Sequence, residues 1–265
     1  MTSPLATRKA RITDRKPNHD GVVFVAEWHQ IRDGKNAMFR SAKSFRADLE
    51  RLHRMGFRPV TATQYLTGRM DLAPGASPVV MTFDDSPKSQ FALLPGGTID
   101  PACAVGIWAD FANAHPDFPV RATFFVLPDT MFGQPKMLER KLAMLKEWGC
   151  EIANHTVTHR SLRSLSPAAV TKELADANAA LTRHGANGPY PMALPMGISP
   201  RDRKLLDRRD LSGVFLVGAN PAPPPGPRLQ AVRTKIPRIQ AYDGELSLNE
   251  WLDQAIKGRV RPYVE

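Results

Sequence analysis

Cysteine is scarce in this chain of 265 residues, which contains Cys103 and Cys150 and no others. Two cysteines do not make a disulfide framework, and a chain of this length can bury a full core without one. Neither has a Cys-x-x-Cys partner, which argues against a structural zinc site. Long apolar runs are also missing, although 42% of the residues are hydrophobic, so we expect no membrane span.

Acidic residues are outnumbered, with 26 Asp and Glu against 36 Lys and Arg, and the formal net charge is +10. A charge of this sign indicates an anionic environment or partner. No zinc-finger spacing, RNP-like motif or basic recognition helix accompanies it, so we expect no nucleic-acid partner. Residues 1–19 are basic and lack periodicity, which predicts a flexible arm before a single domain over residues 20–265.

Strand-like runs alternate with helical patterns along that domain. This alternation predicts an α/β fold in which a parallel sheet is covered by outer helices, with closure into a distorted barrel. The expected strands cover residues 22–28, 58–62, 79–83, 123–127, 151–154 and 214–217, and the expected helices cover residues 44–55, 101–115, 136–148 and 167–183. Residues 91–101 and the proline-rich residues 220–227 are expected to form loops.

Two adjacent carboxylates, Asp84 and Asp85, follow the apolar residues 78–81 in the motif Thr-Phe-Asp-Asp. The run is typical of a buried parallel strand, whose carboxyl end is where α/β folds collect ligands. Neighbouring carboxylates repel unless a cation or a proton separates them. The alternative is that both merely cap the following segment, because Asp is common at turns and N-caps.

Two histidines four residues apart, His155 and His159, stand in the motif His-Thr-Val-Thr-His after a second strand-like run. On a helical turn they would face the same way and could hold one ion, with Thr156 and Thr158 helping to orient the rings. Taken alone, a pair with this spacing more often lies on a solvated turn. Combined with the Asp pair, it indicates an Asp-His-His site that suits Zn, Co, Ni or Fe(II) rather than Ca or Mg.

These two motifs, with Ala-Thr-Phe-Phe-Val at residues 122–126 between them, resemble polysaccharide deacetylases of the NodB-homology group, carbohydrate esterase family 4. The resemblance runs from about residue 21 to residue 251. It implies a distorted (β/α) barrel of about seven parallel strands. It also implies one divalent metal, with Zn preferred and Co, Ni or Fe as alternatives.

The resemblance also implies roles for the motif residues. Asp85, His155 and His159 would hold the metal, and Asp84 would be the catalytic base. An amide is a poor electrophile, so the metal must polarise its carbonyl and lower the pKa of a water molecule. Asp84 would remove a proton from that water, while the metal and a backbone N–H hold the oxyanion.

The chain departs from the family at its third motif, which commonly reads Arg-x-Pro-Tyr-Gly. Residues 193–197 read Ala-Leu-Pro-Met-Gly, so the arginine is absent, as in the branches that act on poly-N-acetylglucosamine. Pro195 and Met196 are expected beside the substrate, with the Met196 N–H facing the oxyanion. Arg238 is the candidate replacement for the arginine, because it follows an expected strand, and the alternative is an ordinary exposed arginine.

A late Leu-x-His motif is also missing. Branches of the family with a permuted motif order carry a Tyr-His pair at the end of the first strand, where this chain has Trp28-His29. We therefore predict that His29 is the general acid, because imidazole titrates near neutrality. The alternative is a strand-end histidine bonded to a backbone carbonyl. Glu27 could orient His29 or face water.

The predicted function is metal-dependent hydrolysis of N-acetyl or O-acetyl groups from a carbohydrate polymer or oligomer. One alternative is a weak or inactive homologue that binds glycan and metal, and another is a metal hydrolase of a non-glycan amide. The retained Asp84 favours an enzyme, because a binding module has no use for a spare base.

The sequence allows two hypotheses for where the protein acts. Residues 1–10 lack the apolar core of a signal peptide, whereas deacetylases that act on polymers work outside the cytoplasm. We expect an extracytoplasmic or cell-wall-associated protein whose signal peptide is absent from this chain, with anionic cell-wall polymers as partners. The alternative is a smaller substrate inside the cytoplasm.

Overall fold

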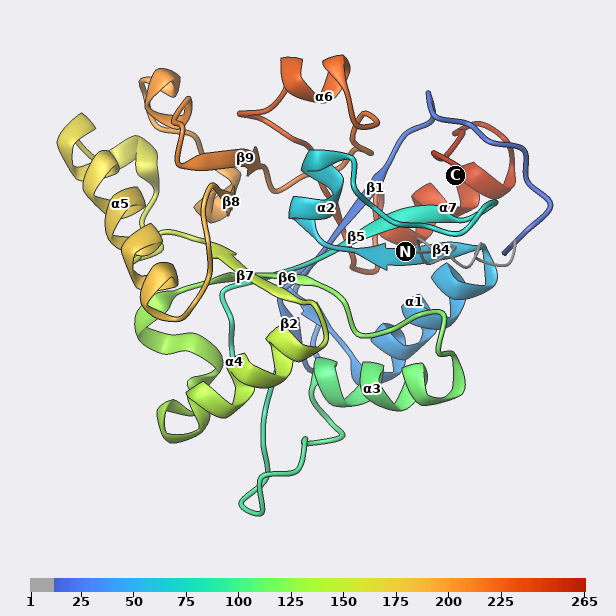
Figure 1. Cartoon of the computed structure of the whole chain (residues 1–265), viewed down its shortest axis with the longest axis horizontal. Coiled ribbons are helices and arrows are strands. Elements are labelled where there is room, and N and C mark those ends of the chain that lie inside the picture. The colour runs from blue at the N-terminus through green and yellow to red at the C-terminus, as the bar shows by residue number, and fades with distance from the viewer. Residues whose placement is uncertain (1–11) are drawn as a thin grey trace, which may run out of the picture.

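A parallel β-sheet forms the centre of the molecule (Figure 1). The structure, a computed structural model, describes residues 12–265, and within that range eight strands form one sheet. Seven of them follow one another in the order β10-β1-β5-β6-β7-β8-β9, while β4 pairs with β5 beside this path. The strands are β1 (Phe24–Trp28), β4 (Phe57–Val60), β5 (Ser77–Asp84), β6 (Thr123–Val126), β7 (Glu151–Asn154), β8 (Tyr190–Ala193), β9 (Leu211–Phe215) and β10 (Ile239–Gln240). The predicted distorted barrel of about seven parallel strands is confirmed.

The central strand β5 has β1 along one side. Its other side is shared, since β4 pairs with its first half and β6 with its last three residues. The sheet then curls back on itself, because Phe215 of β9 pairs with Ile236 and Ala219 bridges to Ile239 of β10. The carboxyl ends of β1, β5 and β7 therefore meet at one end of the barrel. A separate small pair, β2 (Gln30–Ile31) and β3 (Phe39–Arg40), follows β1.

Helices cover the outside of the sheet (Figure 1). They are α1 (Ala42–Arg54), α2 (Ala62–Thr67), α3 (Ala104–Ala114), α4 (Leu138–Glu147), α5 (Pro167–Arg183), α6 (Pro227–Ala231) and α7 (Leu248–Ile256). Short 3-10 turns are η1 (Pro128–Gly133), η2 (Pro135–Met137), η3 (Leu162–Ser164), η4 (Pro195–Gly197) and η5 (Arg203–Leu206). None of the helices within residues 12–265 combines the length and apolar character needed to cross a bilayer.

Local sequence signals explain where the longer helices begin. The Ser166 side chain accepts a hydrogen bond from the Ala169 N–H, and Pro167 occupies the first turn of α5. This Ser-Pro start matches the residues preferred at helix N-termini, and the helix has the predicted bounds. Similarly, Ser41 caps α1, which buries Phe45, Leu49 and Leu52 against the sheet.

Strand β8 escaped prediction. It has four residues and contains Pro191, and proline is unusual inside a sheet because it cannot donate to a neighbouring strand. Strand β10, with two residues, is too short to give a sequence pattern.

The arm predicted over residues 1–19 falls partly outside the described residues, which begin at residue 12. Residues 12–19 contact the domain. The Arg15 guanidinium donates to the carbonyl of Gly75 at 2.9 Å, and the Asn18 N–H donates to the carbonyl of Val264 at 2.9 Å.

Candidate active site

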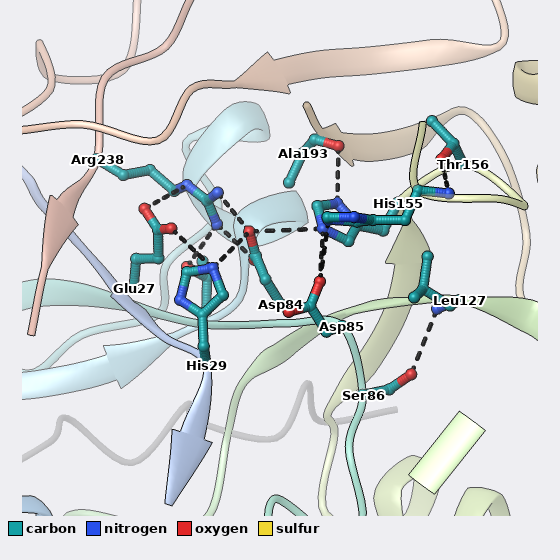
Figure 2. A network of polar contacts seen from close by, with 12 residues as sticks. Glu27, His29, Asp84, Asp85, Ser86, Leu127, His155, Thr156, Ala193 and Arg238 are labelled. Carbon is teal, nitrogen blue, oxygen red and sulfur yellow. Dashed lines mark hydrogen bonds and ion pairs between the residues drawn. The ribbon is translucent and has the colours of Figure 1, made fainter. Parts of the chain in front are cut away.

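The two aspartates at the end of β5 point to different neighbours. Asp84 is the last residue of the strand, and Asp85 and Ser86 have left-handed backbones with φ of 72° and 47°. This conformation is uncommon for residues other than glycine, although Asp adopts it more readily than most, and strained residues of this kind cluster at functional sites. The turn directs Asp84 into the barrel and Asp85 toward the histidines (Figure 2). The two carboxylates therefore do more than cap a segment.

Asp85, His155 and His159 converge on one point. The Nε2 atoms of both histidines lie 3.2 Å from the same oxygen, Oδ1 of Asp85. One ligand atom from each residue lies within 4.8 Å of those of the other two. A carboxylate and two imidazoles form a donor set that suits a divalent transition metal, so these residues fit the expected ion.

The electrostatics of this cluster agree with cation binding. Burial alone would raise the pKa of Asp85, but its hydrogen bonds with His155 and His159 hold the pKa well below the usual range. The pKa of His159 is raised, because Asp85 accepts a hydrogen bond from its ring. The carboxylate therefore stays charged and draws positive charge to this point.

The two histidines do not lie on a helical turn, so that prediction is wrong. They occupy a loop after β7 in which Thr156 and His159 have left-handed backbones, with φ of 65° and 54°. The Nδ1 atom of His155 lies 2.9 Å from the carbonyl of Ala193. A carbonyl can only accept, so Nδ1 carries a proton, and this hydrogen bond turns Nε2 of the ring toward Asp85.

The threonines between the histidines hold the loop rather than the rings. The Thr156 hydroxyl accepts from the His159 N–H at 3.2 Å. Glu173 of α5 accepts from the backbone N–H groups of Val157 and Thr158, each at 3.0 Å, and from the Thr158 hydroxyl at 2.7 Å. Glu173 therefore fixes the shape of the histidine loop, a role that no motif in the sequence announces.

Arg238 lies beside Asp84 and is fully buried, so the reading of it as an exposed arginine is wrong. Its two terminal nitrogens donate to the two carboxylate oxygens of Asp84, both at 2.6 Å. Burial alone would raise the pKa of Asp84, but Arg238 outweighs it and the pKa lies below its ordinary value. Asp84 therefore remains an ionised carboxylate, as a base must be.

Glu27 on β1 and His29 directly after that strand project into the same buried cluster (Figure 2). The Nε2 atom of His29 lies 3.4 Å from Oε1 of Glu27 and 4.0 Å from Oδ2 of Asp84. The ring thus faces carboxylates and not a backbone carbonyl. Glu27 is fully buried, so the expectation that it could face water is wrong.

Gln90 joins the two strand ends that carry the cluster. Its side-chain nitrogen donates to the carbonyl of His29 at 2.7 Å and to the carbonyl of Asp84 at 2.5 Å. Both strand ends are therefore fixed to each other by one buried amide. This contact also could not be expected from sequence, because a lone glutamine carries no motif.

Pro195 and Met196 lie in the turn η4, which is separated from β8 by Leu194 alone. Pro195 is buried, whereas Met196 is 51% exposed and has a left-handed backbone with φ of 56°. The turn is tied to the metal cluster, since Ala193 two residues earlier holds His155. The part of these two residues in substrate binding stays a prediction, as do the catalytic roles of the other site residues.

Comparison with known proteins places the chain in a family. The model of the polysaccharide deacetylase family matches residues 71–211, which is more than half of the chain. The chain therefore belongs to the polysaccharide deacetylase family, of the NodB-homology type.

A relative in sequence is the chitooligosaccharide deacetylase of Rhizobium leguminosarum bv. phaseoli, 32% identical over 133 residues. A second is the chitooligosaccharide deacetylase of Bradyrhizobium sp. (strain ANU 289), 33% identical over 129 residues. The matches cover 49% and 48% of this chain. The chain spans about half the length of these relatives, with 49% and 50% of them matched.

Solved structures share the fold. The deacetylase PplD of Streptococcus pyogenes, in complex with acetate, has a TM-score of 0.62 at 18% identity, with 88% of this chain and 98% of that chain covered. IcaB from Ammonifex degensii has a TM-score of 0.63 at 19% identity, with 90% and 96% covered. At these identities the likenesses concern the fold alone.

Proposed function

We propose that this protein is a metal-dependent deacetylase that hydrolyses N-acetyl groups of a carbohydrate polymer or oligomer, with O-acetyl esters as a second substrate class. The observation that carries this proposal is the pairing of Asp84 with Arg238, which keeps a buried carboxylate ionised 3.9 Å from Nε2 of His155. A site that only bound metal would need no such base. Relatives named chitooligosaccharide deacetylases support the substrate class.

Each residue of the site has a task in this reaction. Asp85, His155 and His159 would hold the metal, with Zn as the expected ion. When bound, the metal supplies polarisation of the acetyl carbonyl and a lower pKa for a nearby water. Asp84 accepts the proton of that water, while Arg238 keeps the carboxylate oriented.

Two further groups act on the acetyl group and on the leaving nitrogen. The Met196 N–H, presented by the turn η4 after β8, donates to the developing oxyanion. His29 gives a proton from Nε2 to the departing nitrogen, because an amine leaves poorly as an anion. Its ring lies 4.0 Å from Asp84, so acid and base flank the same point.

The proposed place of action is outside the cytoplasm, at an anionic cell-wall polymer. The net charge of +10 supports this, because a basic protein is attracted to an anionic matrix.

The test is acetate release by zinc-loaded protein from acetylated glucosamine oligomers and from peptidoglycan. The controls are a chelator and the variant Asp84→Asn. Acetate that disappears in both controls supports the proposal and ranks the substrates. If protein with stoichiometric zinc releases no acetate from either substrate, the proposed activity is wrong.

A further inference from the structure

Five exposed basic residues near the site have no task in the proposed reaction. They lie in two segments of the chain, one after β7 and one after β8, and they are Arg160, Arg163, Arg201, Arg203 and Lys204. The first segment begins directly after the proposed metal ligand His159 and contains the turn η3. The second follows the turn η4 and contains η5. We call these five residues the basic surface.

A hydrogen bond joins the two segments of the basic surface. Nε of Arg201 donates to the backbone carbonyl of Arg163 at 3.2 Å. The two turns also contribute to one apolar cluster, in which Leu162 of η3 and Leu206 of η5 are fully buried. Because these leucines anchor the turns from inside, the basic residues beside them are left facing solvent on neighbouring parts of one surface.

Positive charge predominates there. Within residues 12–265 none of the five basic side chains forms an ion pair, whereas the nearby Arg208 pairs with Asp210. Two carboxylates of the same region bind backbone groups instead. Asp202 accepts from the Lys204 N–H at 3.0 Å, and Glu173 accepts from the histidine loop. The guanidinium groups of the basic surface are therefore available to an anion from outside the chain.

The residues between the metal cluster and Arg201 suit a sugar chain. Met196 and Ile198 are apolar and have 51% and 37% of their surface exposed. Exposed apolar groups gain free energy when they are covered, and sugar rings have hydrocarbon faces that can cover them. A glycan with its acetyl group at the metal cluster could thus extend across these two side chains to the basic surface.

We propose that the basic surface is a subsite for negatively charged groups, carboxylates or phosphates, borne by the acetylated glycan itself. This inference rests on the proposed deacetylation, because the same glycan must present its acetyl group to the metal cluster. A guanidinium offers N–H donors in a fixed fork that matches the oxygens of both kinds of anion. Charges at the edge of a site also speed the approach of an oppositely charged partner, and salt weakens this effect.

Nucleic acid is the competing partner for a basic surface. Single strands are usually bound by aromatic side chains on which the bases stack, but residues 160–165 and 198–206 contain no Phe, Tyr or Trp. A duplex is usually read by a helix or a pair of strands in the major groove, whereas η3 and η5 have three and four residues. The position beside the proposed deacetylase site therefore favours a charged glycan.

The test measures acetate release by zinc-loaded protein from acetylated glucosamine oligomers of one length in three forms. One form is neutral, one has primary hydroxyls oxidised to carboxylates, and one has primary hydroxyls phosphorylated. At low salt we expect kcat/KM for a charged form to exceed that for the neutral form by about 10-fold, and 0.3 M salt, on the order of physiological ionic strength or above, should abolish the excess. The preferred form identifies the anion. No preference for either charged form would overturn the proposal.

Variants connect this preference to the basic surface. Arg163→Gln combined with Arg203→Gln removes two charges and keeps the backbone carbonyl that accepts from Arg201. The ratio of kcat/KM between charged and neutral oligomers should fall about 5-fold, since each exposed ion pair contributes little. Lysine at both positions should restore most of the ratio, because the charge returns.

A matched control removes the same charge elsewhere. Arg54→Gln combined with Arg183→Gln changes exposed arginines in the last turns of α1 and α5. This variant should keep the ratio of the unchanged protein. An equal fall in both double variants would show that net charge, and not the basic surface, sets the preference.

Binding without turnover separates this proposal from the proposed function. Carboxylated and phosphorylated glucose oligomers, which carry no acetyl group, are titrated into zinc-loaded protein by calorimetry. Binding that needs Arg163 and Arg203, in protein that releases no acetate, would contradict the deacetylase and keep the basic surface. Acetate release with binding that ignores both arginines would do the reverse. Tighter binding of an oligonucleotide through the same arginines would overturn the assignment to a glycan.

Discussion

Two clusters of ionisable side chains lie next to each other at the carboxyl ends of the strands, and different partners balance their charges. In the metal cluster, Asp85 and His159 have 28% and 33% of their side chains exposed. In the buried cluster, Asp84 and Arg238 have 1% or less exposed. The metal cluster contains no arginine or lysine and is open to an ion, whereas the buried cluster carries its own cation.

Two adjacent aspartates therefore lie in different clusters, although their side chains are chemically identical. Asp84 and Asp85 share a motif, but a left-handed turn sends one to a guanidinium and the other to two imidazoles. In the proposed reaction the first serves as the base and the second as a metal ligand. Environment, and not residue type, sets the task of each carboxylate.

Removing a ligand should break the metal cluster and leave the buried one intact. His159→Ala is expected to lose stoichiometric zinc, measured by elemental analysis after dialysis, and to reduce acetate release to background. The reason is that two remaining donors hold a divalent ion far more weakly than three. His184→Ala, a histidine outside both clusters, should keep zinc and activity. Zinc retained by His159→Ala would remove His159 from the ligand set.

Neutralising the proposed base should stop turnover but leave zinc binding intact. Asp84→Asn is expected to keep zinc but to lower kcat by about 10³-fold, because an amide cannot accept the proton. It also leaves Arg238 buried without a counter-charge, which costs about 3–5 kcal/mol of stability. Asp48→Asn disrupts a comparable buried pair with Arg40 and should destabilise the fold without a specific loss of kcat. Activity of Asp84→Asn close to that of the unchanged protein would show that Asp84 is not the base.

The support of the histidine loop can be weakened without touching a ligand. Glu173→Ala removes the acceptor of the Val157 and Thr158 N–H groups. We expect zinc affinity, measured by competition with a chelator, to fall about 10–100-fold, as is typical for residues that position metal ligands. Glu173→Gln should recover part of the loss. Unchanged affinity in both variants would mean that the loop keeps its shape without this residue.

The smallest effect is expected at the contact that joins β1 to β5. Gln90→Leu removes the amide that bonds to the carbonyls of His29 and Asp84. We expect kcat to fall about 10-fold, because acid and base lose their relative alignment. Zinc affinity should stay the same, since no metal donor is held by Gln90. A loss of zinc with unchanged kcat per bound ion would place Gln90 in the metal cluster instead.

Local patterns were sufficient for the strand ends that carry the site. An apolar run that ends in Asp84 and a short run that ends before His155 are both visible in sequence, because side-chain type and position coincide there. The predicted helical turn between the histidines was wrong, because two histidines four residues apart can face one point from a helical turn or from many kinds of loop. Arg238 could be proposed from its place after a strand, but its partner Asp84 is more than 150 positions away, as the bidentate contact shows.

Backbone groups and lone polar residues were beyond sequence reasoning. The Ala193 carbonyl that orients His155 depends on where β8 lies, and β8 itself gave no signal because of Pro191. Gln90 and Glu173 act through contacts with backbone amides and carbonyls, which depend on three-dimensional proximity alone. Such contacts fix the positions of the site residues, but the identity of the residues that make them does not reveal them in the sequence.

The Ala193 carbonyl has a consequence for how the protein could be observed. It belongs to the same short stretch of chain as Met196, the exposed residue proposed to meet the substrate. A sugar that pressed on Met196 would also shift the acceptor that orients the His155 ring. With Co(II) in place of Zn, the ligand-field absorption bands would then change as glycan enters, so the colour of the protein would report occupancy before any bond is broken.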